Sequence, residues 1–308
     1  MRLAILADIH ANLPALAAVL ADARQNRVDG FILAGDHITG GPHPNETMDA
    51  LRALEICWMI RCNTDDYLVQ LANGRASFGM CTSRQWAPTR WSFEHLDKDH
   101  LDFIAALPEQ SGVKWNDTAP IRVVHGTPSS STDHLFPEYD TAIAQLFARA
   151  LTLGRNHVSF DQALAAVGEV VLICGHSHIA WDHKHNGRLV LNPGSVGAPI
   201  NGDPRTQYAL LTWREGRWWV EQRFVEYDIP RERAAYNKSG LLVEGGGMAR
   251  AFLRDTETGR NVSGRLLAYA YRLATQAGFS DCAVVPDEVW ERAVTTFDWN
   301  AGSYDNPA

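Results

Sequence analysis

This sequence has few cysteines and no excess of positive charge, and each of these shortages excludes a class of protein. The five cysteines, at positions 57, 62, 81, 174 and 282, are odd in number and form no Cys-x-x-Cys pair. We therefore expect reduced, mostly buried thiols in a reducing compartment. Lysine and arginine number 28 against 36 acidic residues, for a net charge of −8. A nucleic-acid partner held mainly by charge is not expected, although a local basic groove would escape this count.

Long hydrophobic runs are also absent. The first apolar run, residues 3–7, stops at Asp8, which makes it too short for the core of a signal peptide, and no later run approaches a membrane span. With 308 residues, 45% apolar and 21% charged, the composition is that of a soluble globular protein with one large or two small domains. We expect a cytoplasmic protein without membrane contact.

The sequence does contain an alternation of short apolar runs and amphipathic stretches. Strands are predicted at residues 3–7, 31–34 and 56–60, with one helix that Asn12 caps and a second from about 45 to 54. This β-α-β-α-β order implies parallel strands covered by helices. Further strands are predicted at 121–124, 170–174 and 188–191, helices at about 139–151 and from 159, and a hairpin at 208–213 and 217–227.

From about residue 229 the strands stop. We divide the chain into a main domain, residues 1–228, and a helical C-terminal extension, residues 229–308, packed on it. The extension either caps a crevice and selects substrates or covers a sheet edge, and the second role is favoured. Aromatic side chains between residues 86 and 104, among them Trp86 and Trp91, are expected in the core rather than in a substrate platform.

Five apolar runs end in residue types that bind metals. These residues are Asp8, His10, Asp36, Asn63, His125, His176 and His178. Taken singly, each has an ordinary explanation, such as a helix cap for Asp8 or a surface turn for His176 and His178. If His176 and His178 share an extended segment, as we expect, their rings project to the same side. The carboxyl ends of parallel strands meet at one crevice, however, so the joint pattern predicts a single site. Seven ligands are enough for two ions about 3.5–4 Å apart.

The chemistry of these ligands indicates the ions and the reaction. Carboxylate, carboxamide and imidazole groups without a thiolate suit Mn²⁺, Fe or Zn better than Ca²⁺ or a structural zinc. Mn²⁺ is preferred, with Fe, Zn, Ni and Mg as alternatives. Two divalent cations sharing the Asp36 carboxylate would generate a bridging hydroxide near neutral pH and neutralise phosphate oxygens. The sequence therefore predicts phosphoester hydrolysis by direct attack of water.

The order of these motifs resembles the calcineurin-like metallophosphoesterase superfamily. The motifs are Asp8-x-His10, Gly35-Asp36, Asn63-x-Asp65, His125 and Gly175-His176-x-His178. Three further runs, Gly41-Pro42-x-Pro44, Leu191-Asn192-Pro193-Gly194-Ser195 and Gly202-Asp203-Pro204-Arg205, resemble its small prokaryotic phosphodiesterase-like branch. The resemblance covers about residues 1–228. It implies an α/β fold, a four-layer α-β-β-α sandwich of two mixed sheets, with a dinuclear site.

The resemblance also implies a role for each ligand. Asp8, His10 and His178 would hold the first metal, and Asn63, His125 and His176 the second. Asp36 would bridge the two metals. His176 and His178 would then serve different ions although only one residue separates them.

Catalytic roles would fall to Asn63 and Asp65, and Asn12, His43 and His134 are candidate substrate contacts. Two departures from the family pattern matter. Cys62 replaces a glycine, and Thr64 stands where many members place a histidine that protonates or stabilises the leaving oxygen. A threonine cannot act as an acid near pH 7, so general acid catalysis worth about 10²–10⁴-fold is absent or supplied elsewhere.

His43 and His134 are candidates for that role, and solvated loop histidines are the alternative. Esters with good leaving groups should be favoured. We expect a small phosphoester substrate, with phosphodiesters preferred over monoesters. The alternatives are a phosphomonoesterase for nucleotides or for phosphorylated serine and threonine in proteins, and a non-catalytic scaffold such as the retromer subunit of this fold. A homo-oligomer also remains open.

Overall fold

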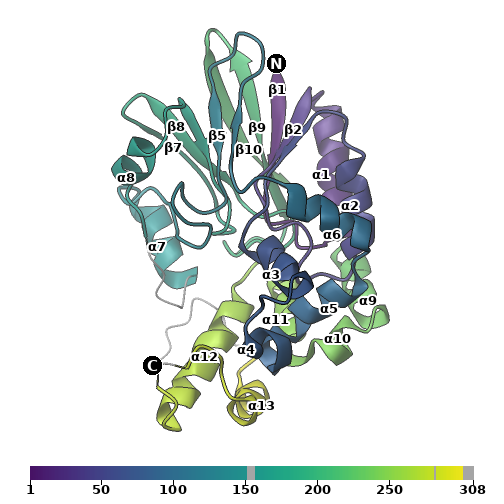
Figure 1. The fold of residues 1–308 in the computed structure, drawn as a ribbon. Coiled ribbons are helices and arrows are strands. Elements are labelled where there is room, and N and C mark those ends of the chain that lie inside the picture. The colour runs from purple at the N-terminus through teal and green to yellow at the C-terminus, as the bar shows by residue number, and fades with distance from the viewer. Residues whose placement is uncertain (151–156, 281, 301–308) are drawn as a thin grey trace.

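The computed structural model describes residues 1–150, 157–280 and 282–300 (Figure 1). The strands form two five-stranded sheets, and the predicted four-layer α/β sandwich is confirmed. In the first sheet the order is β10-β9-β1-β2-β3. Its strands are β1 (Arg2–Leu6), β2 (Gly30–Leu33), β3 (Cys57–Met59), β9 (Thr206–Arg214) and β10 (Arg217–Val225). β1, β2 and β3 are parallel, as the alternation predicted, and the β9–β10 hairpin joins antiparallel to β1.

The second sheet has the order β4-β5-β6-β8-β7. Its strands are β4 (Ser111–Val113), β5 (Ile121–Val123), β6 (Val171–Ile173), β7 (Ala180–His185) and β8 (Arg188–Pro193). β5, β6 and β8 are parallel, and β4 and β7 pair antiparallel at the two edges. The two edge strands were not predicted, because β4, Ser111-Gly112-Val113, is not an apolar run and β7 is mostly polar.

Alternate side chains of the central strands explain the layers. In β1, Leu3 and Ile5 face the second sheet and pack in one fully buried cluster with Ile173 of β6. Ala4 and Leu6 point the other way and pack with residues of α1. Because both faces of these strands are covered, they are continuous apolar runs rather than alternating ones.

In Figure 1 some helices of the main domain lie on the outer faces of the sheets, and others lie beyond one end of the sheets, beside the C-terminal helices. Six precede residue 107: α1 (Leu13–Gln25), α2 (Pro44–Arg52), α3 (Asn63–Ala72), α4 (Phe78–Thr82), α5 (Ala87–His95) and α6 (Lys98–Ala106). A short 3-10 helix, η1 (Arg84–Trp86), precedes α5. α7 (Thr141–Ala150) and α8 (Phe160–Ala165) cover the second sheet. Leu151, the predicted end of the helix at 139–151, lies outside the described residues.

The C-terminal extension is helical, as predicted. It consists of α9 (Ile229–Lys238), α10 (Leu241–Glu244), α11 (Gly246–Thr258), α12 (Val262–Gln276) and α13 (Asp287–Thr296). Its main contacts are with α1, α5 and η1, and Figure 1 shows it gathered at one end of the two sheets. The expectation that it covers a sheet edge is therefore wrong. Among the described helices, none is both long and apolar enough to cross a membrane.

Candidate metal centre

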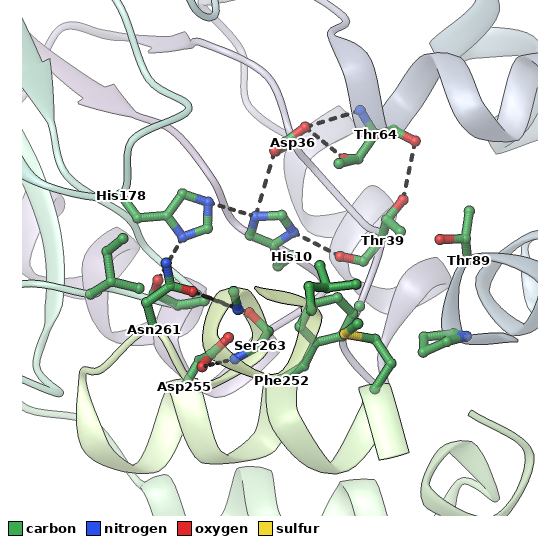
Figure 2. Close-up of a pocket in the computed structure, with 18 of the residues that line it drawn as sticks. His10, Asp36, Thr39, Thr64, Thr89, His178, Phe252, Asp255, Asn261 and Ser263 are labelled. Carbon is green, nitrogen blue, oxygen red and sulfur yellow. Dashed lines mark hydrogen bonds and ion pairs between the residues drawn. The ribbon is translucent and has the colours of Figure 1, made fainter. Parts of the chain in front are cut away.

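The predicted ligands lie together at the carboxyl ends of the central strands. Two groups of side chains place their ligand atoms within 4.8 Å of one another. The first group is Asp8, His10, Asp36 and His178, and the second is Asp36, His125 and His176. Asp36 belongs to both groups, which is the position expected of a bridging carboxylate. Figure 2 shows Asp36, His10 and His178 on one side of a cavity.

Between carboxylate oxygens and imidazole nitrogens at the centre of this cluster, most distances are longer than those of hydrogen bonds. Asp36 Oδ2 lies 3.6 Å from His10 Nε2 and 3.4 Å from His125 Nε2. Asp8 Oδ1 lies 3.4 Å from His178 Nε2 and 3.8 Å from His125 Nε2. Imidazole nitrogens and carboxylate oxygens thus surround a common volume, as the ligands of a metal ion do. Within it, Nε2 of His10 and Nε2 of His178 approach each other to 3.1 Å.

Backbone conformation, rather than strand geometry, directs these side chains inward. Asp8, His10, Asp36, His176 and His178 all have left-handed backbones, with φ between 51° and 66°. Non-glycine residues rarely adopt this conformation, and it concentrates at functional sites. We expected His176 and His178 to share an extended segment, but β6 ends at Ile173. That expectation is wrong, because both residues lie beyond the strand and have left-handed rather than extended backbones.

Backbone carbonyl groups orient the histidine rings. Nδ1 of His10, His125 and His178 lies 2.7, 2.6 and 2.6 Å from the carbonyl oxygens of Thr39, Ala34 and Ala198 respectively. Donation from Nδ1 leaves the Nε2 lone pair directed into the cluster. His176 is reversed, since its Nε2 lies 3.1 Å from the Thr132 carbonyl oxygen. His176 would therefore use Nδ1 as a ligand atom.

Three buried polar atoms at the cluster have no hydrogen-bond partner in the described structure: Asp8 Oδ2, Asn63 Oδ1 and His125 Nε2. A buried acceptor without a partner costs about 1–3 kcal/mol, which a bound cation would offset at these three atoms. All three belong to the predicted ligand set. Their oxygen and nitrogen donors fit divalent cations of the Mn²⁺, Fe and Zn type.

The charges of the cluster shift its pKa values in both directions. Burial acts to lower the pKa of His125, but Asp36 outweighs it and raises this pKa to about 9, so a cation at His125 would displace a proton. Burial raises the pKa of Asp8 well above its usual range. Burial acts on Asp36 in the same direction, but His125 and His10 outweigh it and hold the pKa of Asp36 well below its usual range. Burial and the neighbouring His10 lower the pKa of His178 to about 3, so its imidazole is neutral, the form that binds metals.

The second oxygen of Asp36 is held by the motif that departs from the family pattern. Thr64 Oγ1 and the Cys62 thiol each lie 2.6 Å from Asp36 Oδ1, and both can donate to it. Burial raises the pKa of Cys62, which keeps it a thiol rather than a thiolate ligand. Asp36, Cys62 and Asp65 also have the spacing of a metal site. The protonated thiol makes this third group a hydrogen-bonded support instead.

Asp65 and Asn12 lie beside the cluster but are occupied in holding the backbone. Asp65 accepts hydrogen bonds from the backbone amides of Cys62 and His37, both at 3.2 Å. Asn12 caps α1 by accepting from the Ala15 amide, and it donates to the Gly197 carbonyl. Neither lines the cavity beside the ligands. Their geometry is that of positioning residues.

The two loop histidines have different surroundings. His134 is buried and lines the cavity, and its ring stacks on that of His176 with centroids 4.8 Å apart. His43 lies outside the cavity, and its Nε2 is 3.7 Å from Glu232 Oε2. Of the three predicted substrate contacts, the structure brings only His134 to the site.

The cavity itself has a volume of about 400 Å³ and lies between the ligands and the C-terminal extension. The far wall of the cavity was not predicted from the sequence. Helix α11 contributes Phe252 to this wall, and the start of α12 contributes Asn261 and Ser263. Figure 2 shows these side chains facing His10 and His178. Trp86, expected in the core, lines the cavity as well. Nothing in the sequence near residue 252 resembles a site motif.

Comparisons with known proteins agree with this geometry. The model of the calcineurin-like phosphoesterase superfamily domain matches residues 1–216. An uncharacterised protein of Methanocaldococcus jannaschii is 26% identical over 240 residues, which are 77% of this chain and 90% of that protein. The structure of a metallophosphoesterase from Sphaerobacter thermophilus is 28% identical with a TM-score of 0.61, covering 84% of this chain and 99% of that one.

The structure of a hypothetical protein of Pyrococcus horikoshii shares the fold, with a TM-score of 0.63 at 18% identity. The match covers 84% of this chain and 98% of that one. The two structural matches cover more than residues 1–228 of this chain, so each includes part of the helical extension. Hydrolysis of phosphoesters is the activity that the family model supports. The family model spans more than half of the chain, and the chain therefore belongs to the calcineurin-like phosphoesterase superfamily.

Proposed function

We propose that this chain hydrolyses small phosphodiesters with two divalent cations, Mn²⁺ preferred, held by its seven clustered ligands. The observation that carries the proposal is the position of Asp36, which belongs to both ligand groups at the edge of the cavity. Bound there, two cations would lower the pKa of a water molecule and neutralise charge on the phosphate. Asp8, His10 and His178 would hold one cation, and Asn63, His125 and His176 the other.

The charge of the cavity supports a diester rather than a monoester. Among the described residues that line it, none is lysine or arginine. A diester carries one negative charge, which two cations can neutralise. A monoester dianion or a polyphosphate would gain from additional basic side chains. The enclosing helices α11 and α12 and the volume of about 400 Å³ suit a small molecule rather than a phosphorylated protein.

The chain's own side chains have distinct tasks in this proposal. Thr64 holds one oxygen of Asp36 by a 2.6 Å contact, so that the other oxygen points to His10 and His125. His134, buried at the cavity wall, is placed to contact the substrate or its leaving oxygen. Asp65 holds the turn that carries Asn63 and Thr64.

The test combines metal content with substrate preference. Protein purified without chelator and loaded with Mn²⁺ should bind about two equivalents. His176→Ala and His178→Ala should each bind about one. The loaded protein should hydrolyse bis(p-nitrophenyl) phosphate faster than p-nitrophenyl phosphate. A clear monoester preference would overturn the diester assignment, and less than one ion per chain would favour a non-catalytic scaffold.

A further inference from the structure

The cavity beside the candidate metal ligands is also lined by aromatic side chains. Trp86 comes from η1, while Phe252 and Tyr271 come from α11 and α12 of the extension. Leu267 of α12 adds an aliphatic surface to the same cavity. This aromatic wall, defined as Trp86, Phe252, Leu267 and Tyr271, joins two parts of the chain that are far apart in sequence.

Neighbouring contacts hold the rings of this wall in place. The indole of Trp86 meets Tyr67 edge to face, with centroids 4.9 Å apart. The Tyr271 hydroxyl donates to the Ala283 carbonyl at 3.1 Å. Phe252 packs closely on Gly40, where an added Cβ would lie 3.3 Å from its ring. Positioned rings of this kind can receive a flat ligand with little loss of conformational entropy.

The cavity near the aromatic wall provides no positive charge for a second phosphate. Away from the metal ligands, its acidic lining residue is Asp255, whose Oδ1 accepts from the backbone amides of Val262 and Ser263. Burial raises the pKa of Asp255 to about 7, so a full negative charge is also disfavoured there. Uncharged Asn261 and Ser263 complete the polar rim.

We propose that the aromatic wall is a subsite for an uncharged aromatic group on the substrate, with Phe252 as a specificity-determining residue. The inference rests on the proposed function, because the phosphodiester at the ligand cluster would carry that group as its second ester substituent. Aromatic rings prefer offset or edge-to-face contact with other rings, which an alkyl substituent cannot provide. The extension thereby selects the substrate.

Two substrates with the same leaving group test the subsite. Wild-type protein should hydrolyse p-nitrophenyl phenyl phosphate with a higher kcat/KM than p-nitrophenyl methyl phosphate. Phe252→Leu, which keeps an apolar side chain and removes the ring, should lower kcat/KM for the phenyl ester by about tenfold, mainly through KM. Its effect on the methyl ester should stay within about twofold. Trp86→Leu, from the opposite element, should act in the same direction.

The matched control is Phe279→Leu, because Phe279 lies outside the cavity and is 48% exposed. This variant should leave kcat/KM unchanged for both substrates. Equal losses on both esters in Phe252→Leu, or no loss on either, would overturn the subsite. Correct folding of each variant is checked by its thermal unfolding.

Binding separates the subsite from the proposed function. In isothermal titration, Mn²⁺-loaded wild-type protein should bind diphenyl phosphate more tightly than dimethyl phosphate, and Phe252→Leu should abolish the difference. Selective binding without turnover of any diester would overturn the proposed function and support the subsite. Turnover of diesters without aromatic selectivity would overturn the subsite alone.

Discussion

Asp36 uses its two carboxylate oxygens for different purposes. Oδ2 lies between His10 and His125, where a bridging ligand would meet both cations. Oδ1 faces the donors of Cys62 and Thr64. The threonine that replaces the expected histidine is therefore a support for the Asp36 carboxylate. A hydroxyl is suited to this role because it donates without carrying charge.

Substitutions at these two positions should differ in severity. Asp36→Asn removes the shared anionic ligand, so turnover should become undetectable and metal content should fall. Thr64→Val removes one hydrogen bond to a charged group and should lower turnover by about tenfold. Thr64→Ser restores the hydroxyl and should recover most of the activity. Equal, mild effects of Asp36→Asn and Thr64→Val on turnover would contradict the dinuclear mechanism.

At the scale of elements, the central strands and their helices were predicted to within a few residues. Their apolar runs are long enough to require burial on both faces, and caps such as Asn12 mark helix starts. The left-handed turns that follow β1, β2 and β6 were not predicted. Aspartate and histidine carry no strong signal for that conformation, which the surrounding contacts impose.

Helix α9 buries a carboxylate between the main domain and the extension. Glu232 is fully buried, and both of its oxygens lack hydrogen-bond partners in the described structure. Burial raises the pKa of Glu232 to about 8 and lowers the pKa of the facing His43. Tyr227 and Tyr236 also face this carboxyl group. The surroundings of Glu232 therefore favour the uncharged forms of this carboxyl group and of its neighbours near pH 7.

This burial predicts a pH-dependent stability. In the unfolded chain the Glu232 carboxyl has its usual pKa of 4.5, so between about pH 4.5 and 8 the folded chain retains a proton that the unfolded chain loses. The stability contributed by this group is present below pH 4.5 and is lost as the pH rises toward 8. Glu232→Gln removes this titration and should be more stable than wild type at pH 8, by at least about 1 kcal/mol.

Urea unfolding of wild type and Glu232→Gln at pH 5 and pH 8 measures this difference, which should shrink toward pH 5. The exposed Glu244 of α10 provides the control, because Glu244→Gln should leave the pH dependence of stability unchanged. Identical pH dependence in Glu232→Gln and wild type would show that Glu232 is solvated.

For the whole molecule, the ligand cluster joins the two sheets. Asp8 and Asp36 follow strands of the first sheet, while His125, His176 and His178 follow strands of the second. A cation shared by these residues would bind the folded chain and not the unfolded one. Ligand binding of that kind stabilises the folded state by about 2.7 kcal/mol at a hundred times the dissociation constant.

Metal removal should accordingly lower thermal stability. Treatment with a chelator should reduce Tm by several degrees, and readdition of Mn²⁺ should restore it. His178→Ala should respond less to Mn²⁺ than wild type, because one of its two ions is lost. A Tm that is unchanged by chelator and by Mn²⁺ would indicate that the cluster does not hold cations.

The sequence by itself predicted the candidate ligands and the layered fold. Buried strands must be apolar, and metal ligands must be specific residue types at strand ends, so both leave local patterns in the chain. Only the tertiary structure decided which ligands share Asp36, how the turns direct them, and that α11 and α12 face them across the cavity. Asp36 and Phe252, for example, line one cavity, and no local pattern encodes that segments so far apart in sequence meet there.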